Sequence, residues 1–365
     1  MEKILNYSYP IFLGGESLGE IGKFISTGGY SSVFILTDEN VNNHCLPVLL
    51  EHSEVLKSAF VIEIPAGEEE KNITTSARII SVLLDSNADR KSLMINIGGG
   101  VICDIGGFTA AVYKRGIRFI NIPTTLLSMV DASVGGKNGI NFLDKKNIIG
   151  TFSNPEAVFI YPDFIKTLLP GETRSGYAEI IKHILLSDAV RWMEYQNSIS
   201  SFLDERNLSD LINHSVIFKA DVTREDFREE GRRMILNFGH TIGHAIESFS
   251  LKGSEPLKHG EAIAAGMIAE LYLSFKLAGF PEAEMLRAIQ FIRNVFADIN
   301  LNCTPEDLFP FLYADKKNSL DKIAFSLLRS PGITAGIFYP EIELIVESLI
   351  YLNDEFSRTN FNDKS

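Results

Sequence analysis

The stretch "SLMINIGGGVICDIGGF", residues 92–108, decides the fold of the first half of this chain. It begins with a short apolar run of the kind found in buried strands and then reaches three consecutive glycines, Gly98, Gly99 and Gly100. The residues after the glycines open a predicted helix. A strand that turns tightly into a helix is the repeating unit of an α/β sheet, so the stretch predicts that fold class.

Further strands rich in β-branched residues are predicted on both sides of this unit, over residues 32–38, 60–64, 117–123 and 157–163. Between them, residues 74–86 carry apolar side chains at the spacing of a helix face. Strands that alternate with helices usually pair in parallel. Residues 1–168 are therefore predicted to form an α/β domain with a mainly parallel, Rossmann-like sheet.

The pattern of the sequence changes after about residue 170. The segments "GYAEIIKHILL", "GHTIGHAIESF" and "GEAIAAGMIAELYL" repeat apolar residues with the 3.6-residue period of a helix. Residues 169–365 are predicted to form an all-α domain, and "YPDFIKTLLPGE" is the predicted crossing between the domains. Because ligands often bind between domains, the active site is expected in the cleft between them.

The composition is typical of a globular cytoplasmic protein. The 365 residues are 45% hydrophobic and 22% charged, and no apolar run is long enough to span a membrane. The N-terminus lacks the features of a signal peptide, and three widely spaced cysteines favour a reducing compartment over a disulfide framework. The net charge of −13 argues against nucleic acid as a partner, although a local basic pocket could still bind an anionic small molecule.

The glycine turn after the central strand is a candidate nucleotide site. Its glycines let a ligand approach the backbone, and the start of the next helix offers unpaired N–H groups to a phosphate. Asp38 ends an earlier strand, where a carboxylate can accept hydrogen bonds from ribose hydroxyls. "IPTTLLSMVDASVGGKNGIN", residues 122–141, adds two threonines, an acid, a second glycine pair and Lys137. Together these polar turns predict a bound nucleotide.

Three of the seven histidines lie close together in the second half. His240 and His244 are four residues apart on a predicted helix, so they share one face, and His259 begins the next helix. A catalytic zinc site usually has three protein ligands and one open position. Glu179, near the start of an apolar helix, is the fourth candidate ligand. Spacing alone leaves two ligand sets open: the three histidines, or two histidines with Glu179.

Six motifs occur in the order found in one known family: "GGGVICDIGGF", "KRGIRFINIPTTLLSMVDASVGGKNGIN", "KKNIIGTF", "GYAEIIKHILL", "NFGHTIGHAIE" and "HGEAIAAGM". On these motifs the chain resembles the 3-dehydroquinate synthases of the sugar phosphate cyclase superfamily, along nearly its whole length. The resemblance implies an enzyme of the shikimate pathway, which leads to chorismate and the aromatic amino acids. It would act as a carbon–oxygen lyase that converts 3-deoxy-D-arabino-heptulosonate 7-phosphate (DAHP) to 3-dehydroquinate plus phosphate.

The same resemblance implies two cofactors. Zn²⁺, or Co²⁺ in its place, would be bound by Glu179, His240 and His259, and His244 would lie in the substrate pocket instead. Residues 1–168 would bind NAD and residues 169–365 the metal and substrate. The implied NAD residues lie at strand ends and turns: Asp38, Glu68, Lys71, Gly99, Gly100, Asp104, Thr124, Thr125, Lys146, Phe164 and Thr167.

The substrate residues are likewise implied by the resemblance. They are mostly basic and amide side chains, suited to a carboxylate and a phosphate: Asp131, Lys137, Lys146, Asn147, Lys182, Lys219, Arg233, Asn237, His244 and Lys317, or its neighbour Lys316. Arg115 is expected to reach the pocket of the neighbouring subunit in a homodimer. The partners are thus a phosphorylated keto sugar acid and a second copy of the chain.

The chemistry implied by the resemblance suits these residue types. A zinc-bound hydroxyl has a lowered pKa, which eases hydride transfer to NAD. The ketone so formed acidifies the adjacent C–H bond, so phosphate can leave by elimination and can itself serve as the base. The NADH then reduces the ketone, the ring opens, and the enol closes the carbocycle in an internal aldol step. NAD is regenerated in each turnover.

Three other interpretations are open to test. A cyclase that forms deoxy-inosose or a valiolone would share the NAD and zinc residues but differ at the substrate lysines, Asn237 and His244. An alcohol or glycerol dehydrogenase would need no phosphate clamp and would release reduced cofactor. A catalytically dead regulatory homologue would have lost ligands or lysines. The retained basic residues favour dehydroquinate formation over all three.

Overall fold

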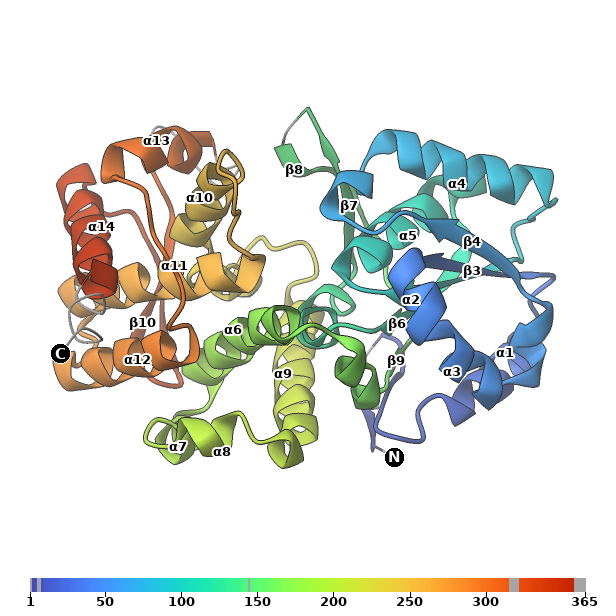
Figure 1. Cartoon of the computed structure of the whole chain (residues 1–365), viewed down its shortest axis with the longest axis horizontal. Helices are drawn as coiled ribbons and strands as arrows, with labels where there is room; N and C mark the ends of the chain where they lie inside the picture. The colour runs from blue at the N-terminus through green and yellow to red at the C-terminus, as the bar shows by residue number, and fades with distance from the viewer. Residues whose placement is uncertain (1, 5–7, 144, 315–321, 358–365) are drawn as a thin grey trace. The chain divides into compact units, whose positions relative to one another are not determined.

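The computed structural model describes residues 2–4, 8–143, 145–314 and 322–357 (Figure 1). Its contacts divide the chain into two compact units. The first unit comprises Met1–Thr173 and Ser209–Arg228, and the second comprises Arg174–Leu208 and Glu229–Ser365. Residues 209–228 therefore belong with the α/β unit and not with the residues around them in sequence. The domain boundary predicted after residue 168 is a different statement from this division by contacts, and it stays a prediction.

A seven-stranded sheet forms the centre of the first unit among the described residues. Six of its strands run parallel, and the edge strand β1 pairs antiparallel with β2. The order is β1 (Glu2–Ile4), β2 (Ile11–Leu13), β9 (Ala157–Ile160), β6 (Arg118–Pro123), β5 (Leu93–Gly98), β3 (Val33–Asp38) and β4 (Phe60–Ile64). The five predicted strands all form within a few residues of their predicted bounds, so the mainly parallel sheet is confirmed.

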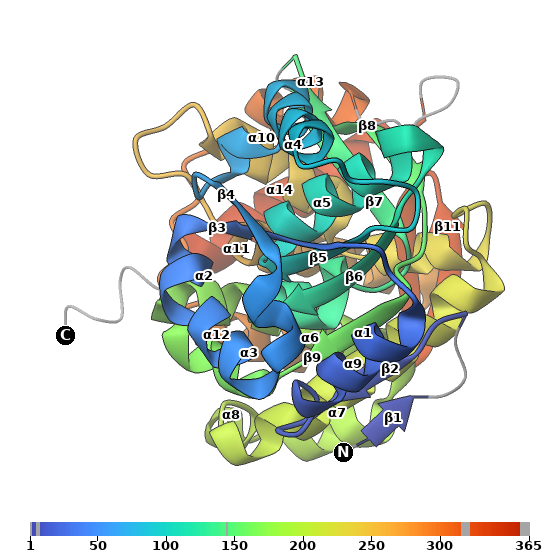
Figure 2. The same cartoon turned by 90° about the vertical axis from the view of Figure 1, so that its right-hand side faces the viewer.

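Helices cover both faces of this sheet, as Figure 2 shows. One face carries α4 (Ile73–Asp85) and α5 (Gly100–Val112), and the other carries α1 (Gly19–Gly28) and α3 (Leu46–His52), with α2 (Glu39–His44) between β3 and α3. A strand covered on both faces has no side that must be polar. This explains why β5 is buried along its whole length and why its sequence is an uninterrupted apolar run.

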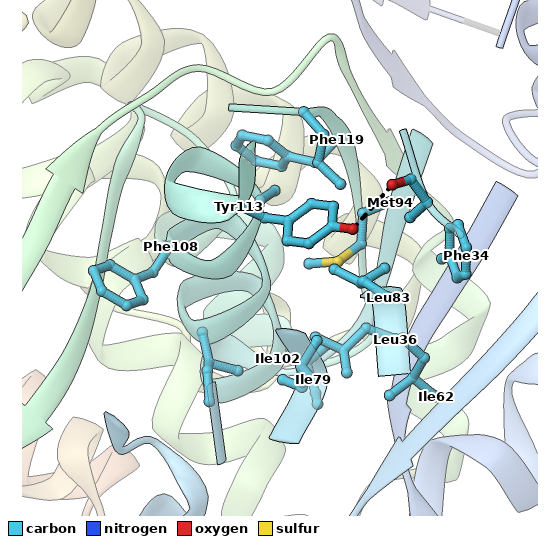
Figure 3. Packing of buried hydrophobic residues seen from close by; sticks show 14 of the residues in the cluster. Phe34, Leu36, Ile62, Ile79, Leu83, Met94, Ile102, Phe108, Tyr113 and Phe119 are labelled. Atoms are coloured by element: carbon cyan, nitrogen blue, oxygen red, sulfur yellow. Dashed lines mark hydrogen bonds between the residues drawn. The ribbon is translucent and has the colours of Figure 1, made fainter. Parts of the chain in front are cut away.

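The apolar core of the first unit lies between the sheet and helices α4 and α5 (Figure 3). Phe34 and Met94 from the strands meet Ile79 of α4 and Phe108 of α5 in this cluster. The Tyr113 hydroxyl in this cluster is satisfied, because it donates to the Ala88 carbonyl oxygen at 2.9 Å. The core therefore fixes the two helices whose N-terminal ends face the candidate nucleotide site.

Two features of the first unit were not predicted from the sequence. An antiparallel hairpin, β7 (Lys137–Phe142) and β8 (Lys145–Phe152), follows β6 and lies against α5. The helix α9 (Glu205–Glu225) continues into residues that belong to this unit. An ion pair between Lys219 and Asp131 and a ring contact between Phe227 and Phe152 attach that segment to it.

The second unit is mainly helical. It contains α6 (Pro170–Ser187) from Arg174 onward, α7 (Ala189–Tyr195), α8 (Ile199–Phe202), α10 (His240–Ser250), α11 (His259–Leu273), α12 (Glu282–Val295), α13 (Pro305–Ala314) and α14 (Ile342–Ser357). It also contains a hairpin of β10 (Phe325–Ser330) and β11 (Ile333–Phe338), which corrects the prediction of an all-α domain. The strand pattern of residues 328–337 is irregular because Pro331 and Gly332 interrupt it at the turn of the hairpin.

Helix α11 is the centre of the second unit, with α10, α12 and α14 packed around it (Figure 1). Nearly all of its residues from Gly260 to Leu273 are buried. A helix that is apolar on every side is stable only when other elements surround it. None of the described helices has both the length and the apolar content that a membrane crossing requires.

Glycines bring α10 and α11 into close contact. A Cβ atom on Gly266 would lie 2.6 Å from the Gly243 backbone nitrogen and would overlap the Gly239 carbonyl oxygen. At the other end of α11, a Cβ atom on Gly260 would overlap the backbone of Ser175 in α6. Backbone atoms cannot move aside as the end of a side chain can, so these positions require glycine.

We expect Gly266→Ala to lower the free energy of unfolding by about 1–3 kcal/mol or more, because the added methyl group must push two helices apart. Gly19→Ala is the matched control, since a Cβ atom there meets nothing within 4 Å. Urea unfolding of both variants measures the difference. Equal midpoints would show that α10 and α11 can separate at no cost.

Candidate active site

Helix α10 is anchored at its first residue by a buried carboxylate. Glu270 of α11 accepts hydrogen bonds from the backbone N–H groups of Gly239 at 2.7 Å, Thr241 at 3.2 Å and Ile242 at 3.4 Å. These are N–H groups that a helix cannot satisfy internally, and the negative charge lies at the positive end of the helix dipole. Glu270 thus fixes the place at which His240 begins the helix.

The three histidines singled out in the sequence lie together in the second unit. The ring centroids of His240 and His244 are 5.1 Å apart, and the ring of His259 lies 5.7 Å from His240 and 6.0 Å from His244. One helical turn separates the first two, and the close packing of α10 on α11 brings the third beside them. The predicted gathering of imidazoles is therefore present in the fold.

Glu179 of α6 reaches the same cluster from the side. Its Oε1 atom lies 3.4 Å from Nε2 of His240 and 3.9 Å from Nε2 of His259. The carboxylate is fully buried, and its Oε2 atom forms an ion pair with the ammonium of Lys182, which is 1% exposed. Among the described residues, no group donates a hydrogen bond to Oε1.

Hydrogen bonds fix which nitrogen of each ring faces Glu179. Nδ1 of His240 lies 3.1 Å from the Phe238 carbonyl oxygen, and Nδ1 of His259 lies 3.3 Å from Oε2 of Glu247. Carbonyl and carboxylate oxygens only accept, so each Nδ1 must carry the hydrogen. A neutral ring then presents the lone pair of Nε2 toward the Glu179 oxygen. Two such nitrogens that converge on one buried carboxylate oxygen form an arrangement that a cation between them would stabilise.

The residues fit a divalent metal ion at this place. Glu179, His240 and His259 each offer one ligand atom, and these atoms lie within 4.8 Å of one another. Ligands bound at about 2.1 Å to a tetrahedral zinc ion lie roughly 3.4 Å apart, close to the two separations from Glu179 Oε1. His244 groups instead with Glu247 and His259. The geometry thus favours two histidines with Glu179 over three histidines.

Other candidate residues of the second unit lie near the start of α10. Arg233 is buried in the short 3-10 turn Arg232–Asn237, which leads into Gly239 and His240. The side-chain amide of Asn237 donates to Oε1 of Glu229 at 2.9 Å. Lys316 and Lys317, the remaining candidates of this half, lie outside the described residues.

The glycine turn of the first unit lies at the point where the strand order reverses. From β3 the chain moves outward to β4 and then returns to β5 on the other side of β3. In doubly wound sheets, ligands bind in the crevice at this switch point, outside the carboxyl ends of the strands. Gly99 is the N-cap of α5, and a Cβ atom on it would lie 3.1 Å from the Thr125 side chain. The glycine therefore lets the two turns after β5 and β6 approach each other.

Charged residues surround this switch point. Asp38 ends β3 and caps α2, with its carboxylate accepting the Val41 N–H at 3.0 Å, and burial raises its pKa. Lys71 and Asp104 form a buried ion pair of 2.6 Å. Burial raises the pKa of the Asp104 carboxyl, while the Lys71 ammonium opposes that rise. Each charged group beside the turn is therefore held in a fixed position.

The candidate substrate residues of the first unit lie on α9, on a π-helical turn and on the hairpin. Nζ of Lys219 lies 2.5 Å from Oδ1 of Asp131 and 2.6 Å from its carbonyl oxygen. Lys137, Lys146 and Asn147 lie on β7 and β8. The structure thus brings Asp131 and Lys219 together, although 88 residues separate them in sequence.

The remaining candidates lie on turns at the ends of the sheet. The Thr167 hydroxyl donates to the carbonyl oxygen of buried Phe164 at 2.7 Å, and Thr124 is buried after β6. Arg115 is exposed and has a left-handed backbone, with φ 68°. A non-glycine residue seldom adopts this conformation, so the turn around Arg115 is strained.

Asn141 was missed in the sequence and connects three candidate residues. Its backbone N–H donates to the Lys71 carbonyl oxygen at 2.7 Å, and its side-chain amide donates to Oε1 of Glu68 at 2.8 Å. Its Oδ1 atom accepts the Asn147 N–H at 2.9 Å. The available signal was a short polar residue between apolar Ile140 and Phe142, but it has meaning only once the hairpin is known.

A solved structure has a similar fold. The chain matches a 2-deoxy-scyllo-inosose synthase complexed with carbaglucose-6-phosphate, NAD⁺ and Co²⁺, with a TM-score of 0.84 and 25% identity. The match covers 95% of this chain and 98% of that chain. The doubly wound sheet, the helical unit and the Glu–His–His cluster thus define the structural class: the fold is that of the sugar phosphate cyclases.

Sequence comparisons identify the family within that class. Family models described as "3-dehydroquinate synthase N-terminal" and "3-dehydroquinate synthase C-terminal" match residues 61–175 and 176–318. A 3-dehydroquinate synthase of Parabacteroides distasonis is 42% identical over 342 residues, which cover 92% of this chain and 96% of the relative. Another, of Desulforamulus reducens, is 39% identical over 336 residues, covering 90% and 92%. The chain belongs to the 3-dehydroquinate synthase family.

We expect Glu270→Gln to lower the free energy of unfolding by about 1.5–3 kcal/mol, because hydrogen bonds from several N–H groups to a buried charge are replaced by weaker ones. Glu255→Gln, at an exposed position, is the control. Chemical denaturation compares the two. If the midpoint of Glu270→Gln equals that of the control, the carboxylate does not anchor α10.

Proposed function

We propose that this chain converts DAHP to 3-dehydroquinate and phosphate as a lyase, with NAD and a divalent ion, Zn²⁺ or Co²⁺, as cofactors. The observation that carries the proposal is the convergence of Glu179, His240 and His259, whose ligand atoms lie close enough together to share one cation. Identity of 42% to a 3-dehydroquinate synthase over nearly the whole chain supports the reaction. The NAD⁺ and Co²⁺ bound in the similar cyclase structure support the cofactors.

When bound, NAD⁺ accepts and returns a hydride, and a divalent ion lowers the pKa of a hydroxyl group that it binds. The ion would be held by Glu179, His240 and His259. The nucleotide would lie at the switch point of the sheet, with its phosphates at the glycine turn before α5 and its ribose at Asp38.

Residues of the second unit would hold the substrate beside the metal ligands. Arg233 presents a planar guanidinium that can bind a carboxylate or phosphate through two parallel hydrogen bonds. Lys182 is already fixed by its ion pair with Glu179, so its remaining donors have a defined direction. His244 lies one helical turn from His240, where its imidazole could take or give a proton at a substrate hydroxyl.

The first unit also contains candidate substrate residues, and their positions are preset. The ammonium of Lys219 donates to the backbone carbonyl oxygen and to Oδ1 of Asp131. The side chain is therefore ordered before the substrate binds. Lys146 and Asn147 lie on β8, and Asn141 ties that segment to the Glu68 loop. An anionic substrate would therefore meet cations whose positions are already fixed.

We also infer that the protein works in the cytoplasm as a homodimer in which Arg115 reaches the partner's pocket. Three buried free cysteines, Cys45, Cys103 and Cys303, agree with a reducing compartment. The strained backbone at exposed Arg115 agrees with a functional position for its side chain. Sedimentation of the purified protein tests the dimer. Mixing Arg115→Ala with an inactive Lys182→Ala variant tests the shared pocket, because mixed dimers should regain activity.

The first prediction from this proposal concerns the reaction itself. Purified protein with NAD and zinc should release phosphate from DAHP with no net accumulation of NADH. Lys182→Ala and His259→Ala should each lower turnover by at least about 100-fold, because each removes a group that stabilises charge in the site. The matched controls are exposed Lys57→Ala and His52→Ala.

The outcomes separate the rival functions. Phosphate release from glucose 6-phosphate in place of DAHP would indicate a different cyclase, and net NADH formation would indicate a dehydrogenase. Inactivity toward every substrate in folded, metal-loaded protein would indicate a regulatory homologue.

The second prediction concerns the metal. Removal of the ion with a strong chelator should stop phosphate release, and added Zn²⁺ or Co²⁺ should restore it, because Glu179 and the two imidazoles lose the cation that they share. Metal content and turnover are measured on the same samples. An unchanged rate in protein shown to be free of metal would rule out a catalytic ion.

A further inference from the structure

We propose that Glu247 is a positioning residue, which holds the His259 ring in the tautomer and orientation needed to bind the metal. This inference rests on the proposed function only in that a divalent ion binds beside Glu179. Glu247 is absent from the ligand set Glu179, His240 and His259, and it lies on the opposite side of the His259 ring from Glu179.

The contact has the geometry of a ligand and its support. Oε2 of Glu247 lies 3.3 Å from Nδ1 of His259, and Nε2 of the same ring lies 3.9 Å from Oε1 of Glu179. The side chain of Glu247 is 8% exposed and that of His259 is 28% exposed. The imidazole of His259 thus lies between two carboxylates, with Glu247 beside Nδ1 and Glu179 beside Nε2. Both carboxylates are less exposed to solvent than the ring.

The Glu247 carboxylate accepts a hydrogen bond from Nδ1 of His259, as a backbone carbonyl accepts one from Nδ1 of His240. Nδ1 of His240 donates to the Phe238 oxygen, which is fixed by the chain two residues earlier. His259 is the first residue of α11, and its partner comes from the neighbouring helix α10. A ring hydrogen-bonded through Nδ1–H can offer only Nε2 to a metal, and a carboxylate partner makes that nitrogen a stronger donor of electrons.

A competing role for Glu247 follows from a second group of candidate ligands. Glu247 also lies near His244, and the three side chains of His244, Glu247 and His259 could offer one ligand atom each. An ion in that group would take the Glu247 carboxylate away from the His259 N–H. The hydrogen bond favours the positioning role, and metal stoichiometry distinguishes the two.

The test measures metal affinity on purified apo-protein. Zn²⁺ is titrated in competition with a chromophoric chelator for the wild type, Glu247→Gln and Glu247→Ala. We expect one ion per chain in all three, and a dissociation constant raised by about 10- to 100-fold in Glu247→Ala, with a smaller rise in Glu247→Gln, which can still accept the hydrogen bond. Glu355→Gln is the control, since it removes a buried carboxylate that pairs with Arg293 elsewhere in the second unit.

Two further readings separate a positioning role from a merely structural one. The thermal midpoint of each apo-protein reports stability, and Glu355→Gln should lose stability without losing zinc affinity. The absorption spectrum of bound Co²⁺ reports ligand geometry, and it should change in Glu247→Ala but not in Glu355→Gln. A zinc affinity within twofold of wild type in Glu247→Ala would overturn the proposal. So would two ions in wild type and one in the variant, which would make Glu247 a ligand.

The same measurements distinguish failure of this inference from failure of the proposed function. Zinc binding is measured without substrate, so protein whose zinc affinity depends on Glu247 but which leaves DAHP unchanged refutes the reaction and keeps the inference. Protein that turns over DAHP while Glu247→Ala binds zinc normally refutes the inference alone.

Discussion

The close packing of α11 against its neighbours is the constraint on which the candidate metal centre depends. Gly266 lets α11 lie against the backbone of α10, and Gly260 lets the start of α11 lie against Ser175 of α6. The first contact brings His259 beside His240, and the second brings it beside Glu179, one helical turn after Ser175. Three ligands from three helices can meet only because two glycines remove side chains from the interfaces. The glycines therefore shape the candidate metal centre although they supply none of its ligand atoms.

Buried carboxylates in the second unit are stabilised in three different ways. Glu270 accepts backbone N–H groups, Glu247 accepts an imidazole N–H, and Glu179 pairs with Lys182 through one oxygen only. A buried charge is costly unless hydrogen bonds or an opposite charge compensate it. The other oxygen of Glu179 faces Nε2 of His240 and Nε2 of His259. A cation bound at that point would compensate the cost of burying this charge.

The sequence predicts those parts of the molecule that depend on local pattern. The strands, α4 and the helices that carry Glu179 and His240 follow from periodicity, and the shared face of His240 and His244 follows from helix geometry. Contacts between distant segments could not be predicted from the residues alone. Glu270 caps a helix from 28 to 31 residues away, and the sequence around Glu247 suggests an ordinary exposed acid on an amphipathic helix. The hairpin β7–β8 was missed because its glycines and lysines suggest turns and ligands, not strands.

The first unit shows why local patterns still located the nucleotide site. The strands β2, β9, β6, β5, β3 and β4 run in parallel, so their carboxyl ends lie at one edge of the sheet. The strand order reverses between β3 and β5. Residues at the carboxyl ends of β3, β5 and β6 are therefore brought to the same edge of the sheet. Asp38 ends β3, Gly99 follows β5 and Thr124 follows β6. Asn141 contacts the Glu68 loop from a hairpin outside the sheet, so the strand ends predicted the first three residues and could not predict the fourth.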